Sequence, residues 1–423
     1  MPPPSEVWIF NHYADAPDRP AGTRHFDLGR GLVRRGFRVT IFAAGFSHAT
    51  LRETRVPKRR LFWVATYDGV RFVWLRTLPY RGNTWLRLAN MLSYAAMALL
   101  VQRRLRRPDA VIGSTIHPFA AAAGYIVARL RGAQFLFEIR DLWPQTLIDM
   151  GALREASLTA RWMRWLEAIL VKRAEVVITL LPETAQYLAQ RGLPADHVLY
   201  LPNGVRLDVH RPGKAPARMA ELIDRLKADG RFVYGYLGAH GRANHLDVVL
   251  DAAAQLSLQA ATAIHVLLIG DGPEKPRLIR RASALGLKNV TFADPIPKNA
   301  VPGTLRRLDG AIIHLADIDV FRFGISPNKL FDYLANEVPV LSACRSPNDP
   351  VADAGAGMSL PPDDASALAT AMRSMAALPT AERRRMGVMG RRYVERHHDI
   401  DLLAGELADR LSSLHARDER SRE

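Results

Sequence analysis

The stretch from Gly324 to Ala343 reads as a polar loop, one short helix and a hydrophobic strand. We expect Ser326 to cap a helix that begins near Pro327, whose missing N–H suits a first helical position. Lys329 and Asp332 then lie on one face of that helix. A helix N-terminus at the carboxyl edge of a parallel sheet suits phosphate, and an acid one turn later can hold ribose hydroxyls. An ordinary capped surface helix is the alternative.

Two glycine-containing segments follow directly on predicted strands, and they could let backbone N–H groups approach a diphosphate. The first runs from Gly235 to Gly241 and includes Gly238 and His240, and the second is Gly270-Asp271-Gly272. Each could equally be a tight turn between a strand and a helix. Neither is the dinucleotide fingerprint, and no acid ends a second strand at the expected distance. We therefore do not expect NAD or FAD.

Asp317 and Asp319 form a D-x-D pattern, which some sugar-nucleotide enzymes use to hold a divalent metal through carboxylate oxygens. The pattern is also frequent by chance. It lies in a loop before the stretch that begins at Gly324. We favour a solvated or cleft-lining role for these two acids and expect no metal site.

Two further candidates follow strands in the first half of the chain. His117 lies between a strand and a helix, so we expect it to point into a cleft, where it could donate to a hydroxyl or phosphate oxygen. Arg140 and Asp141 follow a strand that ends near Glu138, and they could bind an acceptor or handle a proton. A histidine packed at a helix start and a structural Arg–Asp pair are the alternatives.

Short strands alternate with amphipathic helices along both halves, which predicts an α/β fold with two Rossmann-like, doubly wound parallel sheets. The predicted strands are residues 7–10, 38–42, 111–114, 134–138, 176–179, 198–200, 232–237, 265–269, 290–292, 310–314 and 338–341. A chain of 423 residues is too long for one core. We predict domains at residues 1–205 and 206–390, and a helical segment at 391–423 that could pack back on the first domain. Because ligands bind at carboxyl strand ends, the two sheets would face each other across a cleft.

The charge balance predicts an anionic partner. The net charge is +16 and the isoelectric point is about 10.3. No zinc-finger spacing, basic zipper or RNP-like motif is visible, so nucleic acid is not expected as a partner. The single cysteine, Cys344, fits a reducing compartment, and the first residues do not resemble a signal peptide. We therefore expect a cytoplasmic protein.

The longest apolar segment, Trp85 to Val101, is too short to span a bilayer, and basic clusters flank it at residues 58–60 and 103–107. Trp63 and Trp74 lie among basic residues nearby. This combination is typical of an element that docks on an anionic membrane surface. A buried core helix is the alternative.

The ordered set of segments resembles the GT-B glycosyltransferases, most closely the retaining enzymes of family 4. Within that family it is similar to the bacterial branch that adds N-acetylated amino sugars, such as N-acetylfucosamine, to lipid-linked polysaccharide precursors. The matching segments run through nearly the whole chain: RPAGTRHFDLGRGLVRRGFRVTIF, IGSTIHPFAAAAG, FEIRDLWPQTLIDMGAL, TLLPETAQYLAQRG, LPNGV, YGYLGAHGRANHLDVVLDAA, LLIGDGPEK and GISPNKLFDYLANEVPVLSA.

The resemblance implies a UDP-sugar donor bound mainly by the second domain, without an essential metal or other cofactor. It places Asp332 on the donor ribose and Lys329 near the diphosphate, while Gly324 stands where the first acid of the family's E-x7-E motif would be. Arg242 and Lys329 could replace the Arg and Lys pair that many relatives carry near the diphosphate. The donor-binding residues implied are Gly238, His240, Gly241, Arg242, Gly270, Gly272, Ser326, Asn328, Lys329 and Asp332.

The resemblance also implies that the acceptor binds to the first domain. The implied catalytic residues are His117, Asp141 and Lys329, and the implied acceptor-binding residues are Gly22, Thr23, Arg24, Arg140 and Asp141. The implied reaction moves a sugar, with retention, to a polyprenyl-diphosphate-linked saccharide at the inner face of the cytoplasmic membrane during O-antigen or other polysaccharide biosynthesis. Two other functions stay open: a UDP-sugar epimerase of the same fold, and a basic nucleic-acid-binding protein.

Overall fold

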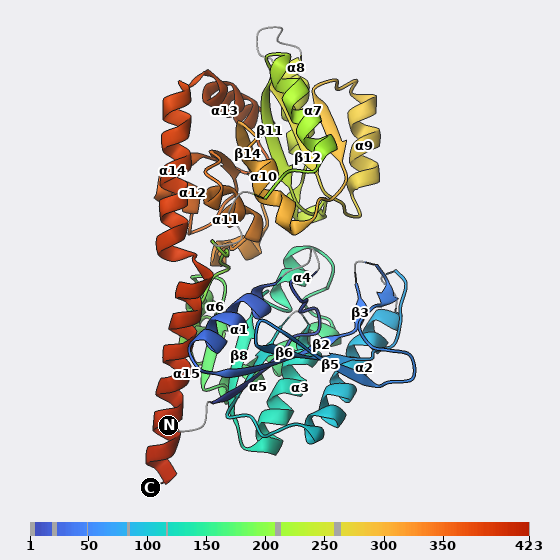
Figure 1. The fold of residues 1–423 in the computed structure, drawn as a ribbon, viewed down its shortest axis with the longest axis vertical. Coiled ribbons are helices and arrows are strands. Elements are labelled where there is room, and N and C mark those ends of the chain that lie inside the picture. Colours follow the sequence, from blue (N-terminus) through green and yellow to red (C-terminus); the bar gives the residue numbers. More distant parts are fainter. Residues whose placement is uncertain are drawn as a thin grey trace. The chain divides into compact units, whose positions relative to one another are not determined.

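The computed structural model describes residues 5–18, 23–48, 50–82, 85–115, 117–207, 213–257 and 264–422, with side chains described up to residue 416. The chain forms two compact units (Figure 1). The first unit comprises Met1–Pro202 and Ile400–Glu423, and the second comprises Asn203–Asp399. Each unit is built around one large β-sheet.

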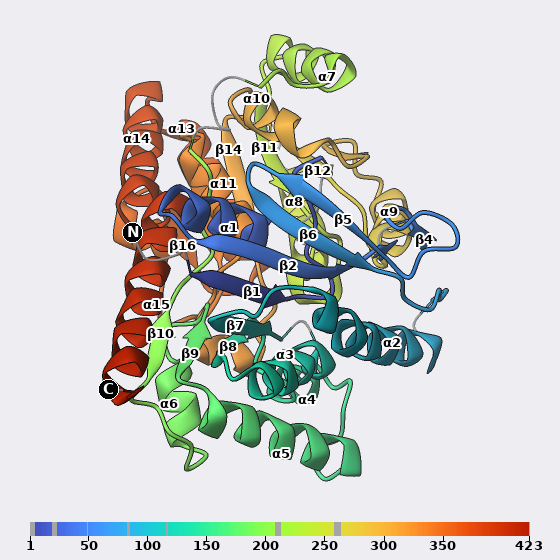
Figure 2. The same cartoon turned by 60° about the horizontal axis from the view of Figure 1, so that its bottom comes forward.

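The sheet of the first unit has the strand order β10-β9-β8-β7-β1-β2-β6-β5, and every neighbouring pair is parallel except β5 with β6 (Figure 2). Its strands are β1 (Glu6–Phe10), β2 (Arg38–Ala44), β5 (Phe62–Tyr67), β6 (Val70–Leu75), β7 (Ala110–Ser114), β8 (Gln134–Ile139), β9 (Val176–Thr179) and β10 (Val198–Tyr200). The predicted strands of this half are confirmed. The hairpin of β5 and β6 and the short pair β3 (Phe46–Ser47) and β4 (Arg52–Glu53) were not predicted.

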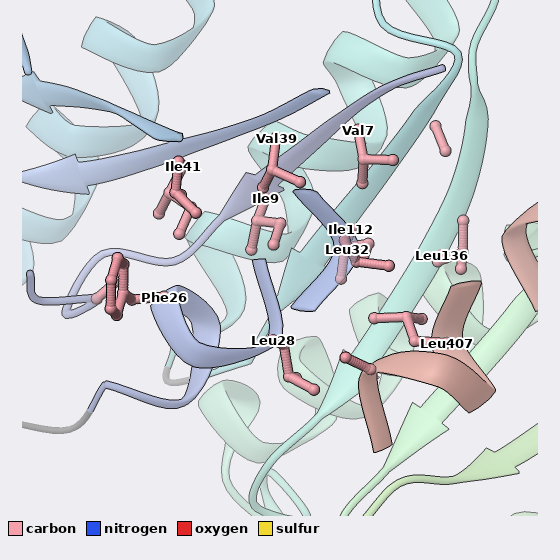
Figure 3. Close-up of a cluster of buried hydrophobic side chains, with 14 of the residues drawn as sticks. Val7, Ile9, Phe26, Leu28, Leu32, Val39, Ile41, Ile112, Leu136 and Leu407 are labelled. Atoms are coloured by element: carbon pink, nitrogen blue, oxygen red, sulfur yellow. The ribbon is translucent and has the colours of Figure 1, made fainter. Parts of the chain in front are cut away.

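Helices cover both faces of this sheet. Helix α1 (Arg24–Arg34) and helix α15 (Ile400–Arg422) share one core with the strands, and Figure 3 shows Val7, Ile9, Leu32 and Leu407 within it. The opposite face carries α3 (Pro118–Arg131), with α2 (Trp85–Val101) and α5 (Leu158–Arg173) packed against it. The shorter elements are α4 (Gln145–Asp149), α6 (Thr184–Ala189) and the 3₁₀ turn η1 (Gln102–Arg104). Because the central strands are covered on both faces, they read as continuous hydrophobic runs.

The second unit is a parallel sheet with the strand order β13-β12-β11-β14-β15-β16. Its strands are β11 (Phe232–Leu237), β12 (Ile264–Ile269), β13 (Val290–Ala293), β14 (Gly310–His314), β15 (Val340–Ala343) and β16 (Gly357–Leu360). The last predicted strand therefore begins two residues later than expected, and β16 was not predicted. Pro339 precedes β15, and the residues before it complete the turn after the helix.

One face of this second sheet carries α7 (Ala217–Ala228), α10 (Val301–Leu305), α11 (Asn328–Ala335), α12 (Pro350–Ala354) and α14 (Thr380–His397). The other face carries α8 (Asp247–Ser257), α9 (Lys275–Ala284) and α13 (Ala365–Ala377). The 3₁₀ turns are η2 (Arg242–Asn244), η3 (Lys298–Ala300) and η4 (Asp319–Phe323). Strands with helices on both faces make this unit Rossmann-like as well.

The chain returns to the first unit at its end. Val394 of α14 is buried in the core of the second unit, whereas Leu403 and Leu407 of α15 are buried in that of the first. The division lies after Asp399, whereas residue 390 was predicted, because α14 packs on α11 and α12 and continues to His397, with Val394 in the core of the second unit. Across the described ranges, the helices lack the combination of length and hydrophobicity that a membrane crossing requires.

Candidate functional site

The turn after β11, Gly238–Gly241 (the glycine turn), rests on the segment that follows β12. The N–H of His240 donates to the carbonyl of Asp271 at 2.8 Å. Gly270 and Gly272 have φ angles of 148° and 158°, which L residues rarely adopt. A Cβ at Gly270 would stand 1.9 Å from the carbonyl oxygen of Gly238, and one at Gly272 would stand 2.4 Å from that of His240. Both glycines are therefore required for the close approach of the two backbone segments.

Lys329, in the first turn of α11, reaches the glycine turn. Its Nζ donates to the hydroxyl of Tyr236 at 2.6 Å and to Oδ1 of Asn244 at 2.5 Å. The same Nζ lies 4.2 Å from the centroid of the Tyr236 ring, within cation–π range. A Cβ at Gly238 would be 3.4 Å from the end of the lysine side chain. Helix α11 and strand β11 thus place a cation beside the glycine turn.

The ammonium of Lys329 is held by neutral acceptors. This ammonium donates to a phenol oxygen and an amide oxygen, and no described carboxylate forms an ion pair with it. Burial lowers the pKa of this lysine to about 7. An anion bound at the glycine turn would stabilise the charged form and raise that pKa. The arrangement suits a phosphate group better than a neutral ligand.

Part of the predicted backbone contribution is already used within the protein. The N–H of Gly238 donates to Ile269 at 3.0 Å, and that of His240 donates to Asp271. The N–H groups of Ala239 and Gly241 donate to no described residue, so these two can reach a ligand. The glycine turn therefore offers fewer free donors than its sequence suggested, because the strand-end contacts take the others.

The His240 side chain is completely buried, and neither ring nitrogen has a hydrogen-bond partner among the described residues. Burial, reinforced by the nearby Lys275 ammonium, lowers the pKa of His240 to about 4, so the ring is neutral at pH 7. Its assignment to the donor stays a prediction. Arg242, next to it, is well exposed, and its Nε is 3.9 Å from a carboxylate oxygen of Glu274.

The capping role predicted for Ser326 is wrong. Helix α11 begins at Asn328, and its N-cap is Pro327, which has no side chain to accept a capping hydrogen bond. The Oγ of Ser326 instead accepts from the N–H of Asn203 at 2.8 Å, and its carbonyl accepts from Nδ2 of Asn203 at 2.6 Å. The serine is therefore used by a segment far away in the sequence.

Asn328 and Asp332, two further residues of the predicted donor set, belong to α11 like Lys329. Asn328 is exposed at the start of α11, and Asp332 is half-buried one turn later. Their contacts with a donor stay predictions. Gly324, which stands where an acid was expected, has a φ of 118°. An L residue is strained at that φ, which explains physically why the position holds glycine.

The two acids of the D-x-D pattern are each paired with an arginine. Oδ2 of Asp317 is 3.1 Å from Arg345, and Oδ2 of Asp319 is 3.5 Å from Arg322. The backbone N–H of Asp317 donates to Asp363 at 3.0 Å. Across the described ranges, acids, histidines and cysteine form no cluster that could hold a metal ion. Both acids thus lie in ion pairs, and the expected absence of a metal stays a prediction.

In the first unit, His117 is buried rather than open to solvent. It is the N-cap of α3, and its Nδ1 accepts from the N–H of Ala120 at 3.3 Å. That bond places the ring proton on Nε2, which donates to Nδ1 of His12 at 2.8 Å. Burial, with a smaller effect of Arg87, lowers the pKa of His117 to about 3. A substrate could receive its proton only by replacing His12, so the catalytic role stays a prediction.

Arg24 belongs to a buried ionic network. Its Nε is 3.1 Å from Glu138, and its two other nitrogens donate to the carbonyls of Pro202 at 2.6 Å and Leu201 at 2.7 Å. His25 is 2.6 Å from the second oxygen of Glu138. Burial alone would raise the pKa of Glu138, but His25, Arg24 and Arg140 hold it well below its usual range. These contacts are structural, so an acceptor contact by Arg24 stays a prediction.

The other acceptor candidates differ in accessibility. Thr23 is buried, and its hydroxyl donates to Asp27 at 2.6 Å. Gly22 lies outside the described residues. Arg140 is half-buried directly after β8, where its N–H donates to the hydroxyl of Thr115 at 3.2 Å, and Asp141 next to it is exposed. The pair Arg140–Asp141 is therefore the part of this set that a ligand can reach.

Sequence reasoning missed three residues that hold the donor-side arrangement. Tyr236 and Asn244 are the partners of Lys329, and Asn244 also donates to the carbonyl of Ala239 at 3.0 Å. His314 is buried and accepts from the N–H of Asp363, so its Nδ1 donates to the carbonyl of Asn244 at 3.0 Å. The only available signal was the position of Tyr236 and Asn244 within and just after the glycine-rich segment.

Two family models match separate parts of the chain. The model described as "Glycosyl transferase 4-like domain" matches residues 21–204, and that described as "Glycosyl transferases group 1" matches residues 231–377. The two matches follow the two structural units in order. The chain belongs to the GT-B glycosyltransferases. In this glycosyltransferase, the group around Lys329 lies in the second matched domain, and His117 and Asp141 lie in the first.

Curated relatives are distant. Over 250 residues the glycosyltransferase is 25% identical to a putative colanic acid biosynthesis glycosyl transferase, WcaI, of Escherichia coli K12, and this match covers 57% of the chain and 60% of the relative. It is 20% identical over 285 residues to a probable glycosyltransferase, WbjE, of Pseudomonas aeruginosa, over 67% and 70% of the two chains. The match to WcaI therefore spans less than two thirds of that protein.

Solved structures share the fold along almost the whole length. Sucrose-phosphate synthase of Thermosynechococcus elongatus aligns with a TM-score of 0.77 at 18% identity, over 98% of this glycosyltransferase and all of that chain. Anabaena HepE, solved with UDP and glucose, aligns with a TM-score of 0.68 at 15% identity, over 97% of this chain and 100% of HepE. WaaG, a glycosyltransferase involved in lipopolysaccharide biosynthesis, aligns with a TM-score of 0.65 at 16% identity, over 96% of this chain and 99% of WaaG. These likenesses establish the GT-B fold.

Proposed function

We propose that this protein transfers a sugar from a UDP-sugar to a lipid-linked saccharide during assembly of a cell-surface polysaccharide. The observation that carries this proposal is the Lys329 ammonium, held at the glycine turn by two neutral oxygens and by no carboxylate among the described residues. A half-buried cation in that setting favours an anionic ligand. The diphosphate of a nucleotide sugar supplies one.

The comparisons support the choice of substrate class. The relative WcaI is named for colanic acid biosynthesis, and WaaG for lipopolysaccharide biosynthesis. HepE was solved with UDP and with UDP-glucose. We propose an N-acetylated amino sugar as the transferred group and retention at the anomeric carbon, as the resemblance of the GISPNKLFDYLANEVPVLSA segment implies.

On the donor side, the bond between the anomeric carbon and the diphosphate breaks, and negative charge develops on the leaving diphosphate. Lys329, the N–H groups of Ala239 and Gly241 and the N-terminus of α11 stabilise that charge. Asp332 accepts hydrogen bonds from the ribose hydroxyls. Because these groups already supply positive charge, we propose that transfer requires no metal or other cofactor.

On the acceptor side, a hydroxyl of the acceptor forms the new bond to the anomeric carbon and loses its proton. Asp141 is exposed at the end of β8, so it is placed to accept a proton or to bind the acceptor together with Arg140. His117 is neutral, and it contributes by orienting a hydroxyl or phosphate oxygen after exchange of its hydrogen bond with His12. The first unit thus binds the acceptor and the second unit binds the donor.

A thermal-shift screen across nucleotide sugars tests the donor half. UDP and UDP-sugars should stabilise the wild type and Lys288→Ala, whose lysine is exposed in the same unit, but not Lys329→Ala. Equal stabilisation of Lys329→Ala would contradict the donor site. Transfer of radiolabel from UDP-N-acetylglucosamine or UDP-glucose to a membrane lipid extract then tests the acceptor class. Conversion of the donor without any extract would indicate an epimerase instead.

A further inference from the structure

Strand β5 forms an edge of the first unit's sheet, and its outer side is paired with no described strand. Leu61 just before it, and Trp63 and Val64 within it, are 55%, 40% and 38% exposed. An open hollow of about 420 Å³ lies along this edge, lined by Arg60, Leu61, Phe62, Trp63, Val64 and Arg104. We call these six residues the β5 groove. An exposed apolar edge strand promotes unwanted association unless something covers it.

Guanidinium groups from two separate segments lie over the aromatic rings of the groove. The guanidinium carbon of Arg60 is 5.3 Å from the centroid of the Trp63 ring, and that of Arg104 is 5.8 Å from the centroid of Phe62. Arg104 belongs to η1, directly after α2, so the tertiary structure brings it to this strand. Because successive strand residues face opposite sides of a sheet, Trp63 with Arg60 and Phe62 with Arg104 lie on the two sides of the β5 edge. An apolar edge bordered by two cations fits an amphiphile that has an anionic headgroup and a hydrocarbon chain.

The charge around the groove is strongly biased. Residues 54–107 contain twelve lysines and arginines and a single acid, Asp68. Exposed cations that form no ion pair with a described residue gather on the two segments that supply the groove: Lys58, Arg59, Arg60, Arg103, Arg104, Arg106 and Arg107. Such a concentration of positive charge attracts anionic lipid. Each cation near the membrane surface increases the affinity for that membrane about fivefold.

Helix α2 also exposes apolar side chains. Asn90 and Tyr94 are buried against the unit, whereas Trp85, Leu88 and Leu92 are exposed on the opposite side of the helix, with Trp85 at 75%. The predicted membrane contact of Trp74 is wrong. Its side chain is buried because β6 is an interior strand between β2 and β5, and the guanidinium of Arg55 lies 4.7 Å from its ring.

We propose that the β5 groove binds an anionic phospholipid at a membrane surface. The lipid phosphate contacts Arg60 and Arg104, and the hydrocarbon chain lies over Leu61 and Trp63. Exposed residues of α2 enter the same interface. The link to a lipid-linked acceptor rests on the proposed function, whereas the lipid site itself rests on the groove and its charge.

A second copy of the chain is the competing occupant, because an edge strand can pair with its equivalent in another molecule. Pairing of two β5 edges would bring the same seven unpaired cations together. Like charges at such short separation oppose association. The charge distribution therefore favours the anionic lipid over a dimer.

Co-sedimentation with vesicles tests the headgroup contact. The wild type should bind vesicles of phosphatidylcholine with 30% phosphatidylglycerol at low salt, and release at high salt or with phosphatidylcholine alone. Arg60→Ala/Arg104→Ala should bind roughly 30-fold more weakly. Arg384→Ala/Arg385→Ala removes two exposed charges from α14 and should bind like the wild type. Equal binding by both double variants, or equal competition by millimolar inorganic phosphate and by vesicles, would overturn the proposal.

Fluorescence quenching by brominated phospholipid tests the apolar contact. Wild-type tryptophan emission should fall on addition of anionic brominated vesicles, and Trp63→Ala should lose part of that quenching and bind more weakly. Ile279→Ser, at an exposed position of the second unit, should change neither. If light scattering shows that the wild type is a dimer and that Trp63→Ala is a monomer, a second copy of the chain covers the groove. That result would overturn the assignment of the groove to lipid. UDP stabilisation measured on the same variants should persist, which separates failure of this site from failure of the donor site.

Discussion

Lys329 and Glu167 are single residues whose pKa values are shifted mainly by burial. Lys329 contacts a phenol and an amide, and the hydroxyl of Tyr187 donates to the Glu167 carboxyl, whose two oxygens lie 3.0 and 3.1 Å from it. Burial lowers the pKa of the lysine to about 7 and raises the pKa of the glutamate to about 8. Both groups therefore change charge near neutral pH, and each change has a measurable consequence.

UDP affinity should fall as pH rises above 7. The free Lys329 loses its proton near pH 7, whereas bound diphosphate requires the charged form, so binding takes up a proton. The dissociation constant should increase by up to about tenfold per pH unit between pH 7.5 and 9. The second ionisation of phosphate, near pH 6, lies below this window.

Isothermal titration of UDP across this pH range checks the prediction. Lys329→Arg keeps its charge throughout, so its affinity should be lower than that of the wild type at pH 7.5 but nearly constant to pH 9. A wild-type affinity that does not change from pH 7.5 to 9 would show that Lys329 does not pair with the ligand.

Glu167→Gln should make stability less dependent on pH. The folded pKa of Glu167, about 8, lies above its unfolded value, so its contribution is present below pH 4.5 and is lost as pH rises through 8. By pH 9 the loss amounts to at most about 5 kcal/mol. Glutamine stays neutral and can still accept from Tyr187. The free energy of unfolding, measured with denaturant at pH 5 and pH 9, should therefore differ less between the two pH values in this variant than in the wild type. An unchanged difference would show that the pKa of Glu167 is not raised.

At the scale of elements, the donor side depends on two loops that touch through their backbones. The segment after β12 can approach the glycine turn only because Gly270 and Gly272 lack a Cβ. This contact, rather than a free array of N–H groups, is what the glycines provide. The turn's position relative to Lys329 then depends on β12 as much as on β11.

Gly270→Ala should weaken UDP binding by tenfold or more. Its Cβ would overlap the carbonyl of Gly238, so the glycine turn must move away from Lys329. Gly286→Ala is the matched control, because Gly286 also has a positive φ, 65°, but nothing within 4 Å of an added Cβ. The control should lose only about 1 kcal/mol of stability and keep UDP affinity. Equal affinities for the two variants would mean that the glycine turn does not contact the ligand.

At the scale of the whole molecule, the last helix completes the first unit. Helix α15 follows α14 directly in sequence, yet its apolar side chains lie in the core with Val7, Ile9 and Leu32. Helix α1 meets it closely, since a Cβ at Gly31 would stand 2.3 Å from Cβ of Ala404. The chain thus closes the first unit only after the second is complete.

Leu407→Ala should destabilise the first unit by about 2–5 kcal/mol, because it opens a cavity under α15. Hydrogen exchange should then increase in β1, β2 and α1 but not in the second unit, and UDP should still stabilise the second unit. Leu402→Ala, on the exposed side of the same helix, is the matched control and should change stability by less than about 1 kcal/mol. An equal increase of hydrogen exchange in both units would show that the two units unfold together.

Local sequence patterns predict the two parallel α/β sheets and most of their strands, because hydrophobic periodicity and glycine placement act over neighbouring residues. It also located Lys329 and the glycine-rich segments. It could not find Tyr236 and Asn244 as the partners of Lys329, the bond between Ser326 and Asn203, or the burial of His117 against His12. Those contacts join residues 85 to 123 positions apart. These contacts follow from the folded arrangement, because which side chains meet depends on how strands are ordered in a sheet and not on local spacing.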